Sequence, residues 1–208
     1  MRLHGSYLSP YTRRVAVSLN VLGIPFELDE VYTSKEPEKV RSFSPLTRVP
    51  ALTLDDGDIL VESAAILDEI DQMVGPERAL IPAGGALRRR VMQATAIGVG
   101  CMEKTQWALY ETRYHPPEKV HDAWIARNEA QVLGGLAHLE GVAAANGTSD
   151  RLLDTPSLTQ ADITVAVAFT FVALVRPALG VGERFPGLAA HAARCEAQET
   201  FLRVAPPQ

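Results

Sequence analysis

The sequence predicts a small α/β domain followed by an all-helical domain. Strand and helix patterns alternate in the first part of the chain, the stretch 81–86 reads IPAGGA like a linker, and only helical patterns follow it. The chain has 208 residues, which is enough for two small domains. We therefore expect an α/β domain over residues 1–77 and a helical bundle domain over residues 86–208.

The first domain begins with a βαβ pattern. Val15, Leu19 and Leu22 recur at helical spacing, and Gly23 and Pro25 end that helix. Short strand signals flank it, and a weak polar helix comes next. The expected elements are a strand over 1–5, a helix over 10–22, a strand over 26–32 and a helix over 35–43.

A β-hairpin is expected after these elements. The apolar runs 51–54 and 59–61 flank the sequence Asp-Asp-Gly-Asp at 55–58, and Asp and Gly tolerate the positive φ that tight turns need. A helix over 63–73 follows. The order β-α-β-α-β-β-α predicts one mixed sheet with helices packed against it.

The second domain shows four helical patterns. Thr159 and Asp162 have the spacing of a capping box at the start of the third helix, where a structural role is the favoured interpretation. The expected helices cover 87–114, 118–145 (closed by Asn146-Gly147), about 159 to 176 and about 187 to 204.

Composition excludes several classes of protein. The hydrophobic content of 47%, with 22% charged residues, is that of a soluble globular chain, and the net charge of -5 gives nucleic acid no reason to bind nonspecifically. Cys101 and Cys195 have neither CxxC spacing nor neighbouring histidines, so we expect no metal site. The N-terminus lacks a signal peptide, which predicts a cytoplasmic protein, and the apolar segment 163–175 is too short to span a bilayer.

Ser9 is the first candidate functional residue. Serine before proline is a favoured helix start, so capping is sufficient to explain Ser9 and Pro10. Arg13 and Arg14, however, add positive charge to the first turn, which suits a nearby anion. The hydroxyl also keeps a proton to donate while it accepts from the helix. A donor there is suited to stabilising a thiolate that the protein itself need not supply.

Three stretches together resemble the cytosolic glutathione S-transferases, in particular the bacterial kind that uses serine. They read SPYTRRVAVSLNVLGIPFE, SPLTRVPALTLDDGDILVESAAILDEI and LTQADITVA, and YETRYHPPEK in the helical half is also similar to the family. The resemblance covers nearly the whole chain. It implies that the first domain has the thioredoxin-like fold.

The resemblance also implies a glutathione site in the first domain. The Ser9 hydroxyl would hydrogen-bond the glutathione sulfur, and the backbone of Val49, before a typically cis Pro50, would bind the cysteinyl part. Glu62 would pair with the γ-glutamyl amino group, and Ser63 would hold its carboxylate at a helix start. Taken alone, Glu62 and Ser63 are better explained as a helix start, and Pro50 as a strand entrance. Lys35 and Arg48 are candidates for the glycine carboxylate.

A second-substrate pocket would lie between the domains. Trp107, Tyr110 and Tyr114 form one aromatic stripe at helical spacing, which a core contact or a dimer contact explains equally well. Tyr7 and Leu8 would form another wall. Tyr7 also competes with Ser9 for the sulfur, and we favour Ser9 because its motif is that of the serine-using members.

The resemblance implies a homodimeric transferase that conjugates glutathione to small hydrophobic electrophiles in detoxification. Glutathione would be a cosubstrate, with no metal, other cofactor, nucleic acid or membrane involved. Two alternatives stay open: a glutathione- or protein-binding stress module without turnover, and a glutathione-dependent isomerase or dehalogenase. His191 stands where many family members carry tryptophan.

Overall fold

The computed structural model describes residues 1–146 and 151–207, which divide into two compact units. The second unit spans residues 84–196, and the segment from Ala197 onward belongs with residues 1–83 in the first. We expected that segment in the second domain. It packs on the first helix instead, because Arg13 Nε donates to the Val204 carbonyl (3.0 Å), Asn20 Nδ2 donates to the Thr200 carbonyl (3.0 Å), and Phe201 is fully buried.

The first unit contains the predicted mixed sheet, and the predicted order of elements is confirmed. The strand order is β2-β1-β3-β4, with β1 and β2 parallel and the other two pairs antiparallel. This is the thioredoxin-like fold. Its elements are β1 (Arg2–Gly5), α1 (Pro10–Leu22), β2 (Glu27–Glu30), α2 (Pro37–Arg41), β3 (Ala51–Thr53), β4 (Ile59–Val61) and α3 (Ser63–Val74).

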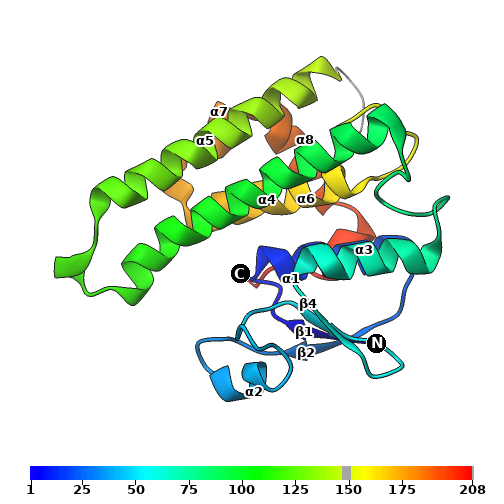
Figure 1. Cartoon of the computed structure of the whole chain (residues 1–208). Helices are drawn as coiled ribbons and strands as arrows, with labels where there is room; N and C mark the ends of the chain where they lie inside the picture. The colour runs from blue at the N-terminus through cyan, green and yellow to red at the C-terminus, as the bar shows by residue number, and fades with distance from the viewer. Residues whose placement is uncertain (147–150, 208) are drawn as a thin grey trace. The chain divides into compact units, whose positions relative to one another are not determined.

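The two faces of this sheet differ in polarity. Figure 1 shows α1 and α3 on one face, where Leu3, Leu52, Val15, Ile66 and Ile70 are buried. Side chains alternate between faces along each strand, so the neighbours of Leu3 in β1 project from the opposite face. That second face carries polar groups.

The second unit is helical within the part of the chain that the structure describes. The predicted helix over 118–145 begins later than expected, at Asp122, because His121 is extended (φ -102°, ψ 91°) and serves as the cap. Asn146 ends it, and Gly147 lies outside the described residues. The helices are α4 (Gly85–Tyr114), α5 (Asp122–Ala145), α6 (Gln160–Val175), α7 (Val181–Arg184) and α8 (Pro186–Glu196), with short 3-10 turns η1 (Pro117–Lys119) and η2 (Pro177–Leu179).

The fourth predicted helix is broken. An extended Gln198 (φ -78°, ψ 142°) separates α8 from α9 (Glu199–Leu202), so the continuous helix expected over 187–204 was wrong. The break directs Phe201 and Val204 into the first unit, where both are buried.

Helix α6 forms the centre of the second unit. The predicted capping box is confirmed: the Thr159 N–H and hydroxyl both donate to Asp162 Oδ2, at 2.8 and 2.7 Å.

In the described residues, no single helix is long and apolar enough to cross a membrane. One bent pair in this described part of the chain, α6 with residues 177–184, reaches that length and hydropathy together, across a bend of 102°.

Candidate functional site

Ser9 caps α1, as predicted. Its backbone is extended (φ -73°, ψ 117°), Pro10 takes the first helical position, and Ser9 Oγ accepts from the Thr12 N–H over a long 3.4 Å. Within residues 1–146 and 151–207 the Ser9 hydroxyl proton has no acceptor. A partly exposed donor therefore stands at the positive end of a 13-residue helix.

Gly5 explains how the end of β1 approaches the start of α1 so closely. A Cβ atom at Gly5 would lie 2.4 Å from Thr12 Oγ1, and Gly5 has φ +145°. Only glycine fits both conditions without displacement. The strand end and the helix cap are therefore held at a fixed separation.

Arg13 and Arg14 are both buried, at 2% and 3% exposure. Arg13 holds the C-terminal segment through Val204. Burial lowers the pKa of Arg14 to about 10, against an opposing effect of Tyr11. Among the described residues, Arg14 Nε and Nη1 have no hydrogen-bond partner.

Tyr7 keeps its proton at neutral pH. Burial and, to a lesser extent, the Glu30 carboxylate raise the pKa of the Tyr7 phenol above its usual value. Tyr7 and Leu8 are both partly exposed in the turn before Ser9. A neutral phenol still donates a hydrogen bond, so the choice between Tyr7 and Ser9 stays a prediction.

The Val49–Pro50 peptide bond is cis, as the resemblance implies. Pro50 is buried directly before β3, and Val49 is partly exposed. Among the described residues, no hydrogen bond occupies the Val49 N–H or C=O. A backbone donor and acceptor are therefore free next to the sheet, which is the arrangement that strand-like binding of a peptide requires.

Glu62 adopts a strained backbone conformation at the start of α3. Among the described non-glycine residues, only Thr47 (φ 51°) and Glu62 (φ 69°) have positive φ, and they stand on either side of the hairpin. Such strain costs about 1–3 kcal/mol and is concentrated at functional sites. Ser63 next to Glu62 opens α3 and is 5% exposed.

Arg48 and Glu62 lie together in the structure. Arg48 Nη1 is 3.3 Å from Glu62 Oε1, with both side chains about half exposed. Lys35 Nζ instead lies over the Tyr32 ring, 4.7 Å from its centre. Of the two cations predicted for the glycine carboxylate, Arg48 is therefore paired with another predicted site residue and Lys35 is not.

The aromatic stripe lies on α4 in the second unit. Tyr110 and Tyr114 meet edge to face with ring centres 4.9 Å apart, and Trp107 Nε1 donates to Glu103 Oε1 (3.3 Å). Trp107 and Tyr114 are 48% and 54% exposed, so these two are not core residues of their unit. Tyr7 and Leu8 belong to the first unit, and the shared pocket stays a prediction.

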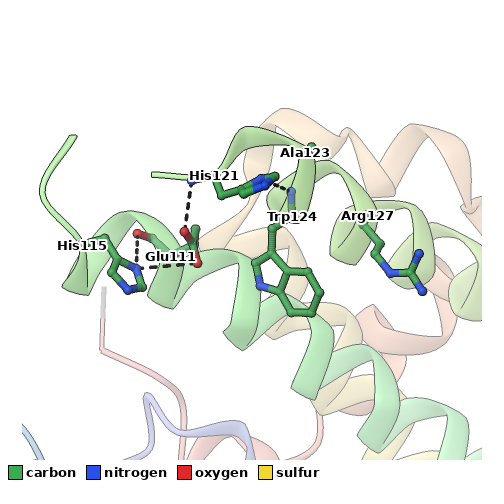
Figure 2. Close-up of a pocket in the computed structure, with 6 residues that line it drawn as sticks. All are labelled: Glu111, His115, His121, Ala123, Trp124 and Arg127. Atoms are coloured by element: carbon green, nitrogen blue, oxygen red, sulfur yellow. Dashed lines mark hydrogen bonds and ion pairs between the residues drawn. The ribbon is translucent and has the colours of Figure 1, made fainter. Parts of the chain in front are cut away.

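A recess of about 500 Å³ lies where α4 and α5 are joined, lined by Glu111, His115, His121, Ala123, Trp124 and Arg127. Figure 2 shows Glu111 between two histidines: the His121 N–H donates to Glu111 Oε1 (3.1 Å), and His115 Nδ1 is 3.6 Å from Glu111 Oε2. None of the predicted site residues lines it. Within the described chain, no group of His, Cys, Asp and Glu is arranged to hold a metal ion.

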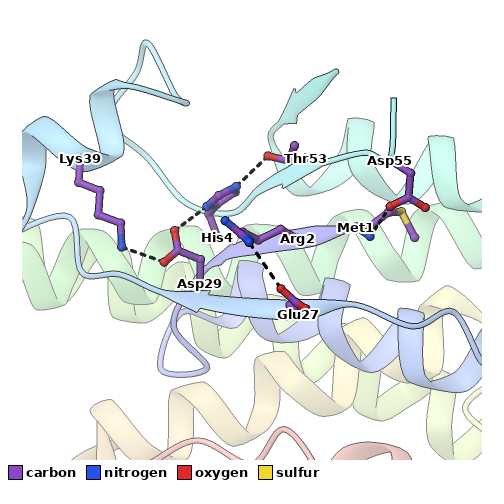
Figure 3. Close-up of polar contacts among 8 residues, drawn as sticks. All are labelled: Met1, Arg2, His4, Glu27, Asp29, Lys39, Thr53 and Asp55. Atoms are coloured by element: carbon purple, nitrogen blue, oxygen red, sulfur yellow. Dashed lines mark hydrogen bonds and ion pairs between the residues drawn. The ribbon is translucent and has the colours of Figure 1, made fainter. Parts of the chain in front are cut away.

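Sequence reasoning missed a polar network around His4 on the second face of the sheet (Figure 3). The signal was the alternation in Arg2-Leu3-His4, which places Arg2 and His4 on the face opposite Leu3. The hydrogen-bond partners of His4 depend on how the strands are paired, and the alternation within one strand does not reveal that pairing.

Comparison with known proteins identifies the family. The model of the glutathione S-transferase N-terminal domain matches residues 3–78, and that of the C-terminal domain matches residues 122–194. The chain belongs to the glutathione S-transferase family. A glutathione transferase family member from Pseudomonas fluorescens Pf-5, solved with bound glutathione, has a TM-score of 0.88 at 29% identity, covering 100% of this chain and 99% of that one.

Two curated relatives are also similar to this chain. The uncharacterized GST-like protein YibF of Escherichia coli K12 is 28% identical over 100% of both chains. The maleylpyruvate isomerase of a Ralstonia species is 34% identical over 49% of this chain and 48% of its own.

Proposed function

We propose that this chain is a glutathione transferase in which Ser9 activates the glutathione thiol. The observation that supports this most directly is the Ser9 hydroxyl at the start of α1, which caps the helix with its oxygen and has its proton uncommitted among the described residues. A hydrogen bond to the sulfur and the positive helix end both favour thiolate over thiol. The free thiol has a pKa of about 8.5, so even a modest reduction increases the thiolate fraction at neutral pH.

The thiolate then attacks an electrophilic carbon of a small hydrophobic compound. A carbon–sulfur bond forms, and the leaving group departs with its electron pair; in an addition, the electrophile instead takes up a proton. Positioning of the two reactants supplies much of the rate. The chain contributes no nucleophile of its own, which agrees with burial raising the pKa of both Cys101 and Cys195 to about 12.

The remaining residues of the first unit would hold the tripeptide. Val49 would pair its free backbone groups with the cysteinyl part, beside cis Pro50. Ser63 and the free amides of α3 suit the γ-glutamyl carboxylate, and Glu62 suits the amino group. Arg48 would have to exchange its contact with Glu62 for the glycine carboxylate, whereas Lys35 has no carboxylate partner among the described residues.

We further propose that the second substrate binds against Tyr7, Leu8, Trp107, Tyr110 and Tyr114, and that the protein is a cytoplasmic homodimer. The exposed aromatic rings of α4 favour a pocket wall over a core stripe, and a dimer contact would serve them equally well. Light scattering would determine the oligomeric state.

Calorimetric titration with glutathione, followed by conjugation to chlorodinitrobenzene, tests the proposal. We expect binding and turnover that saturates in both substrates. Binding without turnover over a broad panel of electrophiles would favour a non-catalytic glutathione-binding module. Failure to bind glutathione at all would refute every glutathione-dependent function.

Isomerisation is the second candidate, because one relative is named a maleylpyruvate isomerase. An isomerase returns glutathione unchanged, so conversion of maleylpyruvate without consumption of thiol would identify it. Stoichiometric loss of thiol would instead favour conjugation.

A further inference from the structure

Strand register brings three polar side chains to the second face of the sheet. His4 pairs with Asp29 across the parallel β1–β2 ladder, and in the antiparallel β1–β3 ladder Arg2 pairs with Thr53. Paired residues share a face, and residues two apart on one strand share it also. His4, Asp29 and Thr53 therefore converge, on the side of the sheet away from α1 and α3.

His4 is the centre of a continuous chain of hydrogen bonds (Figure 3). Its Nδ1 lies 2.8 Å from Asp29 Oδ2 and its Nε2 lies 2.8 Å from Thr53 Oγ1. The ring is 7% exposed. A carboxylate only accepts, so Nδ1 carries the proton in the first bond. Both nitrogens of a nearly buried histidine are thus committed, which fixes the orientation of the ring.

This chain of contacts continues into α2. Lys39 Nζ donates to the other oxygen of Asp29, Oδ1, at 2.8 Å. The Phe43 ring, just after α2, stacks on the His4 ring with ring centres 4.2 Å apart. Val40, which lies between Lys39 and Phe43 in the sequence, is fully buried. The pairing also shifts the pKa of both groups. Burial raises the pKa of Asp29, but hydrogen bonds from Lys39 and His4 outweigh it and lower the pKa overall, while the same bond raises that of Lys39.

Helix α2 depends on such contacts to form at all. It has only 5 residues, and its cap, Glu36, makes no side-chain hydrogen bond to it. A helix that short is unstable by itself in water. The stretch 35–49 that contains α2 also carries Lys35, Arg48 and Val49, so its position determines where these three stand.

We propose that His4, Asp29 and Lys39 are positioning residues that hold the α2 segment, residues 35–43, against the sheet so that it binds the glycyl end of glutathione. This inference rests on the proposed function. None of the three residues touches the reacting sulfur; they act through the segment that they fix. Disrupting them should weaken recognition of the glycine carboxylate and leave the chemistry at Ser9 intact.

Binding of glutathione and of γ-glutamylcysteine, which lacks the glycine, separates this role from general support of the fold. We expect Asp29→Asn, Lys39→Met and His4→Phe each to weaken glutathione binding about tenfold, the loss of one charge-assisted contact, with little effect on γ-glutamylcysteine. KM for glutathione should rise while kcat is unchanged. His4→Gln retains one amide donor and should recover part of the affinity.

Arg2→Gln is the matched control. Arg2 lies on the same strand and face, and its Nη2 is 3.6 Å from Glu27 Oε2 in an exposed pair that joins the two strands. Towards α2, the Arg2 charge opposes the network, because it lowers the pKa of Lys39 where Asp29 raises it. We expect wild-type binding of both ligands. Amide hydrogen exchange should accelerate over residues 35–43 in the three test variants and stay unchanged in Arg2→Gln. Lys39 is 43% exposed, so Lys39→Met provides a folded variant even where Asp29→Asn does not fold.

Several outcomes would overturn the inference. If the variants lose affinity for glutathione and for γ-glutamylcysteine equally, the network only supports the sheet. If all three variants bind glutathione like the wild type, the network has no role in positioning the α2 segment. If only Lys39→Met loses affinity for glutathione, Lys39 contacts the glycine carboxylate directly and is not part of a positioning network. If the unaltered protein binds γ-glutamylcysteine and glutathione equally, no glycine subsite exists. If it binds neither, the proposed function itself fails.

Discussion

Ser9 caps α1, and a pair of substitutions separates this role from the activation of the glutathione thiol that we propose for it. Ser9→Ala removes both the cap and the donor, and should cost about 1 kcal/mol of stability. Ser9→Asp retains a good cap but has no proton to donate, because an ionised carboxylate only accepts. The pKa of bound glutathione should rise by about one unit or more in both variants, leaving roughly tenfold less thiolate.

Ultraviolet titration of the bound thiolate and chemical unfolding measure these two effects independently. We expect Ser9→Asp to unfold like the wild type while it conjugates slowly, and glutathione affinity to change little in Ser9→Ala. If Ser9→Ala conjugates glutathione at the wild-type rate but is less stable, Ser9 is only a helix cap. Tyr7 would then be the better candidate for the hydrogen bond to the sulfur.

The two cysteines of the chain should be inert in the folded protein. Cys101 and Cys195 are 3% and 1% exposed, and burial raises the pKa of each thiol to about 12, with Asp162 and Glu196 adding to the effect at Cys195. A thiol that stays protonated reacts slowly. Iodoacetamide should label neither cysteine at neutral pH and both in denaturant. Rapid native labelling would show that the second unit opens.

At the scale of the element, two adjacent glycines in α5 predict opposite effects. A Cβ atom at Gly135 would lie 2.5 Å from Cys101 Sγ of α4, whereas one at Gly134 meets nothing within 4 Å. Gly135→Ala should therefore destabilise the protein by about 1–3 kcal/mol through overpacking. Gly134→Ala should stabilise it by roughly 0.5–1 kcal/mol, because alanine has the higher helix propensity.

Thermal or urea unfolding of both variants tests this contrast. A double variant, Gly135→Ala with Cys101→Ala, removes the sulfur and should recover part of the loss. If Gly134→Ala destabilises the protein as much as Gly135→Ala does, contact with Cys101 is not the cause of the loss, and some other feature of the helix disfavours alanine at both positions.

Element boundaries were predictable where local chemistry sets them. Helix α1 runs from Pro10 to Leu22 as expected, because Ser9 caps it, Pro10 starts it and Gly23 ends it in a left-handed conformation (φ 68°). The break between α8 and α9 was not predictable, since it depends on Phe201 fitting the first unit. What breaks the helix at Gln198 is its extended backbone conformation, and glutamine as a residue type does not indicate such a break.

For the candidate site, the sequence predicted residues whose roles stay predictions. Ser9, Val49 and Glu62 came from motifs, and their local geometry is consistent with the roles assigned to them. The positive φ of Glu62 has no sequence signature, because glutamate rarely adopts it. The network around His4 needs two strand pairings and the position of α2, which involve residues as distant as Thr53. Long-range register of this kind is absent from any local pattern.

At the scale of the whole molecule, His191 should make stability depend on pH. It is 1% exposed; its Nε2 lies 3.2 Å from the Asp162 carbonyl oxygen and 3.7 Å from Cys195 Sγ. Among the described residues its Nδ1 has no partner. Burial lowers the pKa of His191, Asp162 opposes this, and Arg194 and Arg151 add to the lowering.

The direction of the effect follows from proton binding. The unfolded chain takes up a proton at His191 near pH 6.5, whereas the folded chain does so only at lower pH. The unfolded state therefore binds more protons in this window, and the free energy of unfolding falls as pH decreases below about 6.5 until the folded pKa is reached. One such group contributes at most about 1.4 kcal/mol per pH unit. Asp29 has a lowered pKa too, but its effect appears only in more acidic solution, near the ordinary aspartate range.

Urea unfolding at about pH 7.5 and about pH 5.5 tests this dependence. The wild type should lose stability between the two, and His191→Phe should lose less, because phenylalanine cannot take up a proton in the unfolded state. His138→Gln is the matched control: His138 is exposed on α5, and its replacement should leave the pH dependence unchanged. An identical slope in His191→Phe and the wild type would assign the acid sensitivity to other groups, and the buried imidazole would then have no part in it.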